Sequence, residues 1–408
     1  MLLTNRQLFL RHQAQTSPFP ALLEIAGAHG NYLIDTSGKK YLDLISGISV
    51  NSLGHGNEKV KKAMIDQLNL HQHVMVYGEF IQGAQTNLSA TLTSLLPQNL
   101  NCVYLLNSGA EATDVALKLA KRVTGRRNIL ACKHAYHGST HAALSLNSEE
   151  YYKQAFRPLL PGISFINFND SNAIKQINED TCCVITEVVQ GEAGYIPADK
   201  LFLRALRNRC NETGTLLIFD EIQSGMGKTG KLFAFEHDGI VPDILLLGKA
   251  LGAGMPIGAV VSSQQHMQSL SEGPVLGHLT TFGGHPVIAA AALAGIEVLL
   301  ESKLMYQVEA KEILFRTLLV HPAIKSISGK GLMLAVVLDT FENNLNVIQG
   351  CMADGLITDW FLFADNRIRI APPLTITTVE IEMACKVILK NINRVYPAFS
   401  SSNKLFSS

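Results

Sequence analysis

Four apolar runs of this chain each end in polar residues that could do chemistry. The runs 103–106, 184–186, 216–219 and 244–247 are followed, respectively, by Asn107-Ser108-Gly109-Ala110-Glu111, Glu187, Asp220 and Gly248-Lys249. A carboxylate or an amine beside a buried strand is costly unless it has a partner. Open α/β sheets bind ligands beyond the carboxyl ends of their strands, so we expect these side chains to converge on one ligand site.

Lys249 is the residue with the most distinctive position. It lies between the apolar run 244–247 and the glycine-rich segment 252–256. One interpretation is an exposed loop lysine that extends past an apolar stem. The other is a desolvated amine with a lowered pKa, which is suited to Schiff-base chemistry. Asp220 favours the second interpretation, because a pyridine-type cofactor needs a carboxylate at its ring nitrogen.

The segment after the first run has the features of a helix start. Ser108 and Glu111 are three residues apart, as in a capping box. The simpler interpretation is a well-capped helix and nothing more. Gly109 and Ala110 have little side chain, so an anion such as phosphate could reach the backbone N–H groups at the positive helix end.

A glycine-rich segment at 225–230 is a weak candidate for a nucleotide-binding loop. The pattern G-x-x-x-x-G-K-S/T would need glycine at position 222, which is Ile222. The segment also follows the carboxylate of Asp220, where nucleotide phosphates would be repelled. We therefore expect no nucleotide triphosphate here and predict that Lys228 and Lys231 are solvated loop charges.

Three histidines, His134, His137 and His141, have a spacing that zinc ligands can have. The segment lacks the glutamate of the H-E-x-x-H pattern, and Gly138 with Ser139 indicates a loop rather than a helix. We expect no metal at these histidines. Tyr136 is of more interest, because its flat ring could lie against a cofactor ring.

The composition excludes several classes of function. Lysine plus arginine number 34, as do aspartate plus glutamate, so the formal net charge of the 408 residues is zero. A broad basic face for nucleic acid is therefore excluded, and an acidic disordered chain is disfavoured. The chain is 47% hydrophobic and only 17% charged, which indicates extensive burial in a core or a subunit interface.

The sequence also predicts a cytoplasmic, soluble protein with no membrane partner. None of its seven cysteines forms a C-x-x-C pair, so we expect reduced, buried thiols. Arg6 and Arg11 interrupt the apolar N-terminal stretch, which disfavours a signal peptide. No apolar run approaches the roughly 18–20 residues that a membrane span needs.

Short apolar runs alternate with helical periodicity through the middle of the chain. We expect strands at 103–106, 129–131, 184–186, 216–219, 244–247 and 259–261, and helices at 111–123, 201–213 and 287–300. This alternation predicts an α/β fold with a mostly parallel sheet that is covered on both faces. We expect a large domain at 52–300 and a smaller α/β domain from both chain ends, 1–51 and 301–408.

Six motifs in the same order connect these elements with a known family. They are NSGAEA (107–112), AYHG (135–138), QGEAG (190–194), IFDEIQSG (218–225), LGKALGAGMPIGA (247–259) and TTFGGHP (280–286). With these motifs the chain resembles, over nearly its whole length, the class III pyridoxal-phosphate aminotransferases, the group of the acetylornithine, ornithine and 4-aminobutyrate aminotransferases. The resemblance implies pyridoxal 5′-phosphate as cofactor, the aspartate aminotransferase fold (fold type I) and a homodimer.

The resemblance also implies a role for each matching residue. Lys249 would hold the cofactor as a Schiff base and then move the proton between substrate and cofactor. Asp220 would keep the pyridine nitrogen protonated. Gln223 would hydrogen-bond the phenolic oxygen of the cofactor, and Tyr136 would lie against its ring face. Ser108, Gly109 and Ala110 would bind its phosphate, and Thr281 would reach the cofactor phosphate of the partner subunit. Glu187 would support the pocket.

The resemblance assigns the substrate end to Arg369 and Glu192. Arg369 matches an arginine that binds a substrate carboxylate, and its fork suits bidentate pairing. Glu192 matches a glutamate that covers this arginine in some relatives while an amine binds. The alternative for this pair is an ordinary surface salt bridge. Ser139 stands where acetylornithine and ornithine enzymes usually have an arginine for a second carboxylate.

The activity implied is transamination by a ping-pong mechanism. An amine or amino acid, of the acetylornithine or ornithine type or another ω-amino donor, would give its amino group to an oxo-acid acceptor such as 2-oxoglutarate. Two alternatives stay open. One is an aminomutase of the glutamate-semialdehyde type, and the other is a non-catalytic protein of the same fold.

Overall fold

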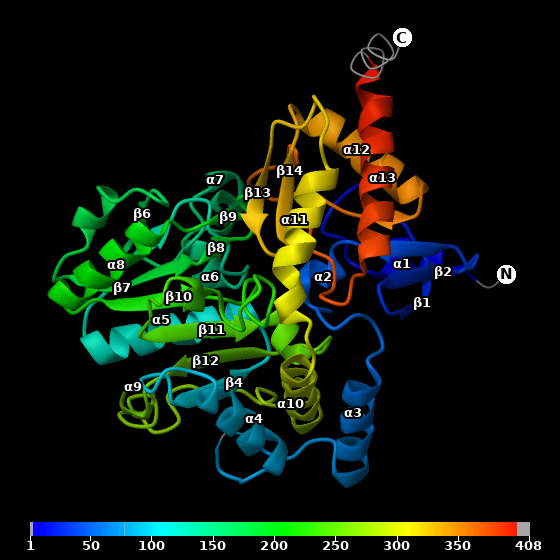
Figure 1. Ribbon diagram of the computed structural model, residues 1–408. Helices are drawn as coiled ribbons and strands as arrows, with labels where there is room; N and C mark the ends of the chain where they lie inside the picture. Colours follow the sequence, from blue (N-terminus) through cyan, green and yellow to red (C-terminus); the bar gives the residue numbers. More distant parts are fainter. Residues whose placement is uncertain (1–2, 77, 398–408) are drawn as a thin grey trace.

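The computed structural model describes residues 3–76 and 78–397 (Figure 1). The helices are α1 (Asn5–His12), α2 (Ser46–Ser49), α3 (Glu58–Leu70), α4 (Gly83–Ser94), α5 (Gly109–Thr124), α6 (His141–Ser145), α7 (Glu150–Lys153), α8 (Lys200–Thr213), α9 (Gln264–Gln268), α10 (Pro286–Glu301), α11 (Val308–Leu318), α12 (Phe341–Ala353) and α13 (Thr378–Val395). A short 3-10 turn, η4, covers Lys249–Gly252.

The strands form one large sheet and three small ones. They are β1 (Ile25–His29), β2 (Tyr32–Asp35), β3 (Lys40–Asp43), β4 (Cys102–Leu106), β5 (Asn128–Cys132), β6 (Ile163–Ile166), β7 (Thr181–Glu187), β8 (Val189–Gln190), β9 (Ile196–Pro197), β10 (Leu216–Asp220), β11 (Ile244–Gly248), β12 (Gly258–Ser262), β13 (Ser326–Lys330), β14 (Met333–Val337), β15 (Leu356–Ile357) and β16 (Arg367–Ile370). The large sheet has seven strands in the order β4-β12-β11-β10-β7-β5-β6.

The seven-stranded sheet is mostly parallel, as predicted. Only β12 is antiparallel to its neighbours β11 and β4, and the other six strands share one direction. The carboxyl ends of these six strands therefore lie at the same edge of the sheet, which is the edge where the sequence predicted a site.

Both faces of this sheet are buried, which explains its continuous apolar runs. On β10, Leu217 and Phe219 pack in the cluster that includes α8, whereas Leu216 and Ile218 pack in the cluster that includes α5. Successive side chains of a strand point to opposite faces. An apolar residue at every position is therefore what a sheet between two layers of helices requires.

The two ends of the chain fold together beside the large sheet. Strand β15 pairs in parallel with β3, so residues near 356 join the sheet begun by β1, β2 and β3. Strands β13, β14 and β16 form a separate antiparallel sheet. Figure 1 shows the blue N-terminal strands next to the orange and red helices α12 and α13.

The expected elements of the large sheet are all present, each slightly longer than its apolar run. Helix α5 begins at Gly109 rather than at 111, and α10 begins at Pro286 rather than at 287. Strand β6, which pairs with β5 at the sheet edge, was not predicted. The domain boundaries at 52 and 300 remain predictions. Among the described residues, no helix is long and apolar enough to cross a bilayer.

Candidate active site

A small cavity of about 180 Å³ lies at the carboxyl edge of the seven-stranded sheet. Its lining residues are Gly109, Ala110, Tyr136, His137, Gly138, Ser139, Glu187, Gly191, Glu192, Asp220, Ile222, Gln223 and Lys249. They include Glu187 and Asp220, the last residues of β7 and β10, together with Lys249 directly after β11 and Gly109 three residues after β4. The predicted convergence of polar strand ends on one site is confirmed.

Lys249 lies at the point where this cavity meets a second one. The second, large cavity of about 440 Å³ is lined by Ile48, Tyr136, Glu192, Lys249, Asp359, Trp360, Leu362 and Arg369. Lys249 has a left-handed φ of 45°, which is strained for a non-glycine residue and typical of functional sites. Burial lowers the pKa of its amine. The amine has no hydrogen bond or ion pair with any residue that the structure describes.

Asp220, the last residue of β10, is fixed by two hydrogen bonds. Its Oδ1 accepts from the backbone N of Ile222 at 3.0 Å, and its Oδ2 lies 2.7 Å from Nδ1 of His137. Burial disfavours a charged imidazole, but the hydrogen bond to Asp220 and the charges of Asp220 and Glu187 together outweigh burial and raise the pKa of His137. The pair therefore places an imidazole and a carboxylate in direct contact on the wall of the small cavity.

The three histidines with metal-like spacing have separate partners. His137 bonds to Asp220, His134 to Glu149 at 3.0 Å, and His141 to the carbonyl of Pro158 at 2.8 Å. The sequence did not predict the contact between His137 and Asp220, because 83 residues separate them.

Glu187, at the end of β7, lines the small cavity and holds the backbone around it. Its carboxylate accepts from the backbone N of Gly191 at 2.8 Å and of Tyr136 at 3.3 Å. Burial raises the pKa of Glu187 to about 7. Nearby, Oε1 of Gln223 is buried without a hydrogen-bond partner among the described residues. A ligand in this cavity could supply one.

The start of α5 differs in one detail from the predicted capping box. Oγ of Ser108 accepts from the backbone N of Glu111 at 3.2 Å, as expected. The carboxylate of Glu111 instead accepts from the backbone N of Asn107 at 2.8 Å, one residue earlier. Gly109 and Ala110 line the small cavity, whereas Ser108 is exposed beside it. A Cβ at Gly109 would lie 2.7 Å from Cδ1 of Ile222, so a larger residue there would require the Ile222 side chain to shift.

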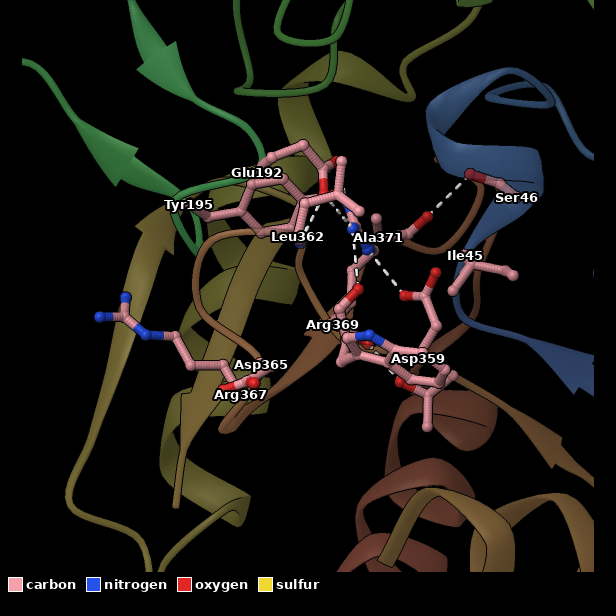
Figure 2. A network of polar contacts seen from close by, with 12 residues as sticks. Ile45, Ser46, Glu192, Tyr195, Asp359, Leu362, Asp365, Arg367, Arg369 and Ala371 are labelled. Carbon is pink, nitrogen blue, oxygen red and sulfur yellow. Dashed lines mark hydrogen bonds and ion pairs between the residues drawn. The ribbon is translucent and has the colours of Figure 1, made fainter. Parts of the chain in front are cut away.

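Arg369 and Glu192 meet in the large cavity, as the sequence suggested. The guanidinium donates from Nη1 to Oε1 of Glu192 at 3.1 Å and from Nη2 to Oε2 at 2.9 Å, a bidentate pair (Figure 2). Arg369 is 2% exposed, so the alternative of a surface salt bridge is wrong. Burial opposes ionisation of Glu192, but the charge of Arg369, its hydrogen bonds and smaller contributions from Lys249 and Leu362 together outweigh burial and lower the pKa of Glu192.

The sequence missed the residues on the other side of Arg369. Nε donates to Oδ1 of Asp359 at 2.7 Å, and Nη2 donates to the carbonyl of Trp360 at 3.0 Å. The guanidinium also lies 4.2 Å from the ring centre of Phe361. No motif in a single sequence marks the segment 359–361, which precedes Arg369 by eight to ten residues.

The wall opposite this arginine comes from a left-handed turn at the start of the chain. Ser46, Gly47, Ile48 and Ser49 have φ values of 45°, 63°, 60° and 63°. Ile48 lines the large cavity, and Ser46 donates to the carbonyl of Ala371 at 2.7 Å, which ties this turn to the arginine strand. A β-branched residue in this region costs roughly 1–2 kcal/mol, so packing must hold it there.

Lys228 corrects the prediction of a solvated loop charge, whereas Lys231 is exposed. The side chain of Lys228 is 0% exposed, and its amine donates to the carbonyl of Ala371 at 3.1 Å and of Pro372 at 2.6 Å. Burial lowers its pKa from 10.5 to about 7. The sequence placed it in a glycine-rich loop but gave no sign of partners 143 residues away.

Thr281 and Ser139 complete the predicted set. Thr281 is exposed in this single chain and does not line the small cavity. Its neighbour Thr280 anchors the turn by accepting from Nδ2 of Asn107 at 2.9 Å. Ser139 lines the small cavity, and its hydroxyl lies 3.0 Å from that of Tyr136.

Comparison with known proteins identifies similar sequences along most of the chain. The family model described as "Aminotransferase class-III" matches residues 13–392. An acetylornithine aminotransferase of Bacillus cereus is 38% identical over 377 residues, which cover 90% of this chain and 94% of the relative. A LysW-aminoadipate semialdehyde/glutamate semialdehyde transaminase of Sulfurisphaera tokodaii is 38% identical over 320 residues, covering 77% of this chain and 81% of the relative.

A solved structure shows the same fold. The ornithine aminotransferase of Toxoplasma gondii, whose description reports pyridoxal phosphate at partial occupancy in the active site, superimposes with a TM-score of 0.88. The sequence identity is 29%, and the match covers 96% of this chain and 94% of that chain. The predicted fold type I is confirmed by this likeness.

Proposed function

Since this chain belongs to the class-III aminotransferases, we propose that it moves an amino group from an ω-amino donor of the acetylornithine or ornithine type to an oxo acid such as 2-oxoglutarate. The coarser activity follows from the family: the chain is an aminotransferase with pyridoxal phosphate as its cofactor. The donor, the acceptor and the role of each residue are our proposals.

The small cavity has the groups that this cofactor requires. It has a carboxylate for a pyridinium nitrogen, an amine for a carbonyl, an aromatic ring, and the N-terminus of α5 for a phosphate. The unpartnered Oε1 of Gln223 and the unpartnered Nε2 of His137 are buried polar atoms, among those described, that a bound polar ring could satisfy. The residues present therefore fit pyridoxal phosphate.

When bound, the cofactor supplies a reactive carbonyl and a ring that accepts electrons. Lys249 anchors it covalently and, once released, serves as base and acid for the proton at the substrate carbon. Its position fits both tasks, because the amine lines the small and the large cavity at once. Burial lowers its pKa, so a larger fraction of this amine is neutral and able to accept a proton.

Asp220 holds the ring nitrogen protonated, and His137 holds Asp220 in place. Gln223 contacts the phenolic oxygen, Tyr136 covers the ring face, and Glu187 fixes the backbone that carries Tyr136 and Gly191. The charge of Asp220 is the group that makes the ring an electron acceptor, because it favours the cationic form of the nitrogen.

Ser108, Gly109 and Ala110, at the N-terminus of α5, would bind the phosphate of the cofactor. Thr281 contributes from the partner subunit in a homodimer. Two observations support this arrangement: Thr281 is exposed on an anchored turn, and the apolar side chains Leu279 and Phe282 beside it are 46% and 56% exposed. Exposed apolar surface of this kind favours a subunit contact.

Glu192 acts as a gate over Arg369. With Glu192 in place the guanidinium is neutralised, and the large cavity accepts an amine without a carboxylate at that end. When Glu192 withdraws, the fork is open to the carboxylate of the oxo acid. The apolar walls of Ile48, Trp360 and Leu362 suit the carbon chain of an ω-amine.

The observation that carries this function is the position of Lys249 between the two cavities. The test is a panel of amines and amino acids added to the cofactor-loaded protein without acceptor, with loss of the cofactor's visible absorbance as readout. We expect ω-amines to bleach the cofactor and to release one oxo product per site. An aminomutase would instead convert its substrate without releasing an oxo product, and absence of bleaching with every amine would contradict the proposal.

A further inference from the structure

Arg369 has hydrogen-bond partners besides Glu192, the proposed gate. Its five N–H bonds are all used: two by Glu192, one by Asp359, one by the carbonyl of Trp360, and one by the hydroxyl of Tyr195 at 3.4 Å. Figure 2 shows these contacts on two sides of the guanidinium, with Glu192 on one side and Asp359 on the other.

These contacts divide into a movable set and a fixed set. If Glu192 withdraws, the contacts to the segment 359–361 remain, because that segment pairs with the arginine strand. The backbone N of Arg369 donates to the carbonyl of Asp359 at 2.9 Å, and Thr358 donates to the carbonyl of Arg369. The fixed set therefore determines where the open fork points.

Asp359 is the member of the fixed set that defines orientation. Stacking on Phe361 fixes the plane of the guanidinium but allows rotation within that plane. The single hydrogen bond from Nη2 to the carbonyl of Trp360 still allows the guanidinium to rotate about that contact. A second bond, from Nε to Asp359 at 2.7 Å, stops the rotation and keeps Nη1 and Nη2 directed at the position that Glu192 vacates.

We propose that Asp359 is a positioning residue that keeps Arg369 in place for the substrate carboxylate when Glu192 withdraws. This inference rests on the gate in the proposed function. Without Asp359, the guanidinium would follow the carboxylate of Glu192 to which it is bidentately bonded, and the fork would be lost to the substrate.

The negative charge of Asp359 contributes less than its hydrogen bond. Glu192 and a substrate carboxylate occupy the same side of Arg369, so the charge of Asp359 weakens the binding of both to a similar extent. The equilibrium in which a substrate carboxylate replaces Glu192 on Arg369 is therefore nearly independent of the charge of Asp359. It follows that asparagine, whose side-chain oxygen can accept from Nε, should replace Asp359 almost fully.

The experiment compares variants at residue 359 in the cofactor-loaded protein with Glu192 intact, so that the probe must replace Glu192 on Arg369. The probe is glutarate, an unreactive carboxylate, and the readout is its dissociation constant by calorimetry. Asp359→Ala and Asp359→Leu should weaken glutarate binding by about tenfold, whereas Asp359→Asn should stay within about threefold. Arg369→Ala in the same background measures the part of the affinity that depends on the guanidinium.

Asp365→Ala is the matched control. This aspartate is exposed in the same segment, and Figure 2 shows it away from the guanidinium of Arg369. It removes the same charge without touching the arginine, and glutarate binding should not change. Unfolding temperatures of all variants show which of them are folded. If Asp359→Ala is not folded, Asp359→Leu takes its place in the comparison.

The half-reactions of the same variants give a second readout. Asp359→Ala should raise the KM for 2-oxoglutarate by about tenfold, change kcat by less than about threefold, and leave the half-reaction of a carboxylate-free amine unchanged.

Unchanged glutarate binding in Asp359→Ala and Asp359→Leu overturns the proposal. Equal weakening in Asp359→Asn also overturns it, because the charge rather than the hydrogen bond would then matter. Glutarate binding does not require turnover. If no amine bleaches the cofactor but the binding pattern holds, the proposed function fails while the positioning role of Asp359 stands.

Discussion

The small and the large cavity share Tyr136, Glu192 and Lys249 but are built in different ways. The small cavity is built largely from residues at the carboxyl ends of adjacent strands in one sheet, so its geometry follows from the topology. The large cavity combines a turn near residue 48, a loop near 192 and the segment 359–369. Its geometry depends on contacts between distant parts of the chain, which makes it the part of the site more easily altered by substitution.

The electrostatics of the two cavities differ in the same way. In the small cavity, Asp220 and His137 form a fixed pair that is fully buried behind the ligand position. In the large cavity, Arg369 lies between the carboxylates of Glu192 and Asp359. How far its positive charge is neutralised therefore depends on the positions of these two side chains. The first arrangement gives a constant field, and the second can change during a reaction cycle.

The largest effect should come from Lys249, one of the three residues common to both cavities. Lys249→Ala should lower turnover by at least about 10²–10⁴-fold, because it removes the proton carrier and the covalent anchor. Steady-state assays of the purified variant measure this loss. Lys231→Ala, at an exposed lysine that follows the glycine-rich segment 225–230, is the control and should keep wild-type turnover.

Borohydride reduction followed by peptide mapping tests the same residue independently. The cofactor should be attached to Lys249. Attachment to the buried Lys228 would show that the assignment is wrong.

The next largest effect should come from the small cavity alone. Asp220→Asn should slow the amine half-reaction by about 10²–10³-fold, because the ring nitrogen loses its fixed negative partner. Cofactor binding should weaken by about 1.5–3 kcal/mol, the value of a hydrogen bond to a charged group. Stopped-flow absorbance and cofactor titration measure the two effects. Near-normal half-reaction rates in the variant would remove Asp220 from this role.

A smaller and one-sided effect should come from the large cavity. Arg369→Ala should cost about 1.5–3 kcal/mol of carboxylate binding, which is roughly a 10–150-fold higher KM for the oxo acid. The half-reaction of a carboxylate-free amine should change much less, because Glu192 covers the arginine when such an amine binds. Measuring both half-reactions separately tests this. Equal losses in the two would show that Arg369 anchors donor and acceptor alike and that there is no gate.

The smallest effect concerns the other buried lysine, Lys228, outside both cavities. Its folded-state pKa is about 7 and its usual value is 10.5, so between these values the unfolded chain binds more protons than the folded chain. The free energy of unfolding should therefore rise with pH in this window. Relative to Lys228→Met, the wild-type protein should gain about 1–2 kcal/mol between pH 7 and pH 9.

Urea unfolding of both cofactor-loaded proteins at pH 7, 8 and 9 measures this difference. Every other titratable group, Lys249 included, is present in both proteins, so its contribution cancels from the comparison. Parallel pH dependences of the two proteins would show that Lys228 is protonated in the folded state throughout.

The comparison of the cavities also explains what the sequence could predict. Lys249 and Asp220 were predicted because each ends or follows a legible strand, and parallel strands bring such ends together. The pairing of Arg369 with Glu192 was suggested only by resemblance. Asp359 carries no signal of its own, since its hydrogen bond to Arg369 depends on the fold of β16 against the segment before it.

One wrong prediction and one missed contact have the same physical origin. Lys228 was expected to be solvated because local glycines indicate a loop, but the carbonyls of Ala371 and Pro372 arrive from the far end of the chain. His137 was weighed only as a metal ligand, because a single sequence does not show that Asp220 is its neighbour. Local patterns predicted elements and their ends, and long-range contacts decided which side chains were buried and paired.

Trp360 gives the large cavity a built-in optical probe. It is the single tryptophan of the chain, it lines this cavity at 41% exposure, and its carbonyl accepts from Arg369. Emission excited selectively in the tryptophan band therefore comes from the arginine end of the site. Changes in its intensity or wavelength during single turnovers would report on events next to Asp359 without a label, and Trp360→Phe would supply the dark reference.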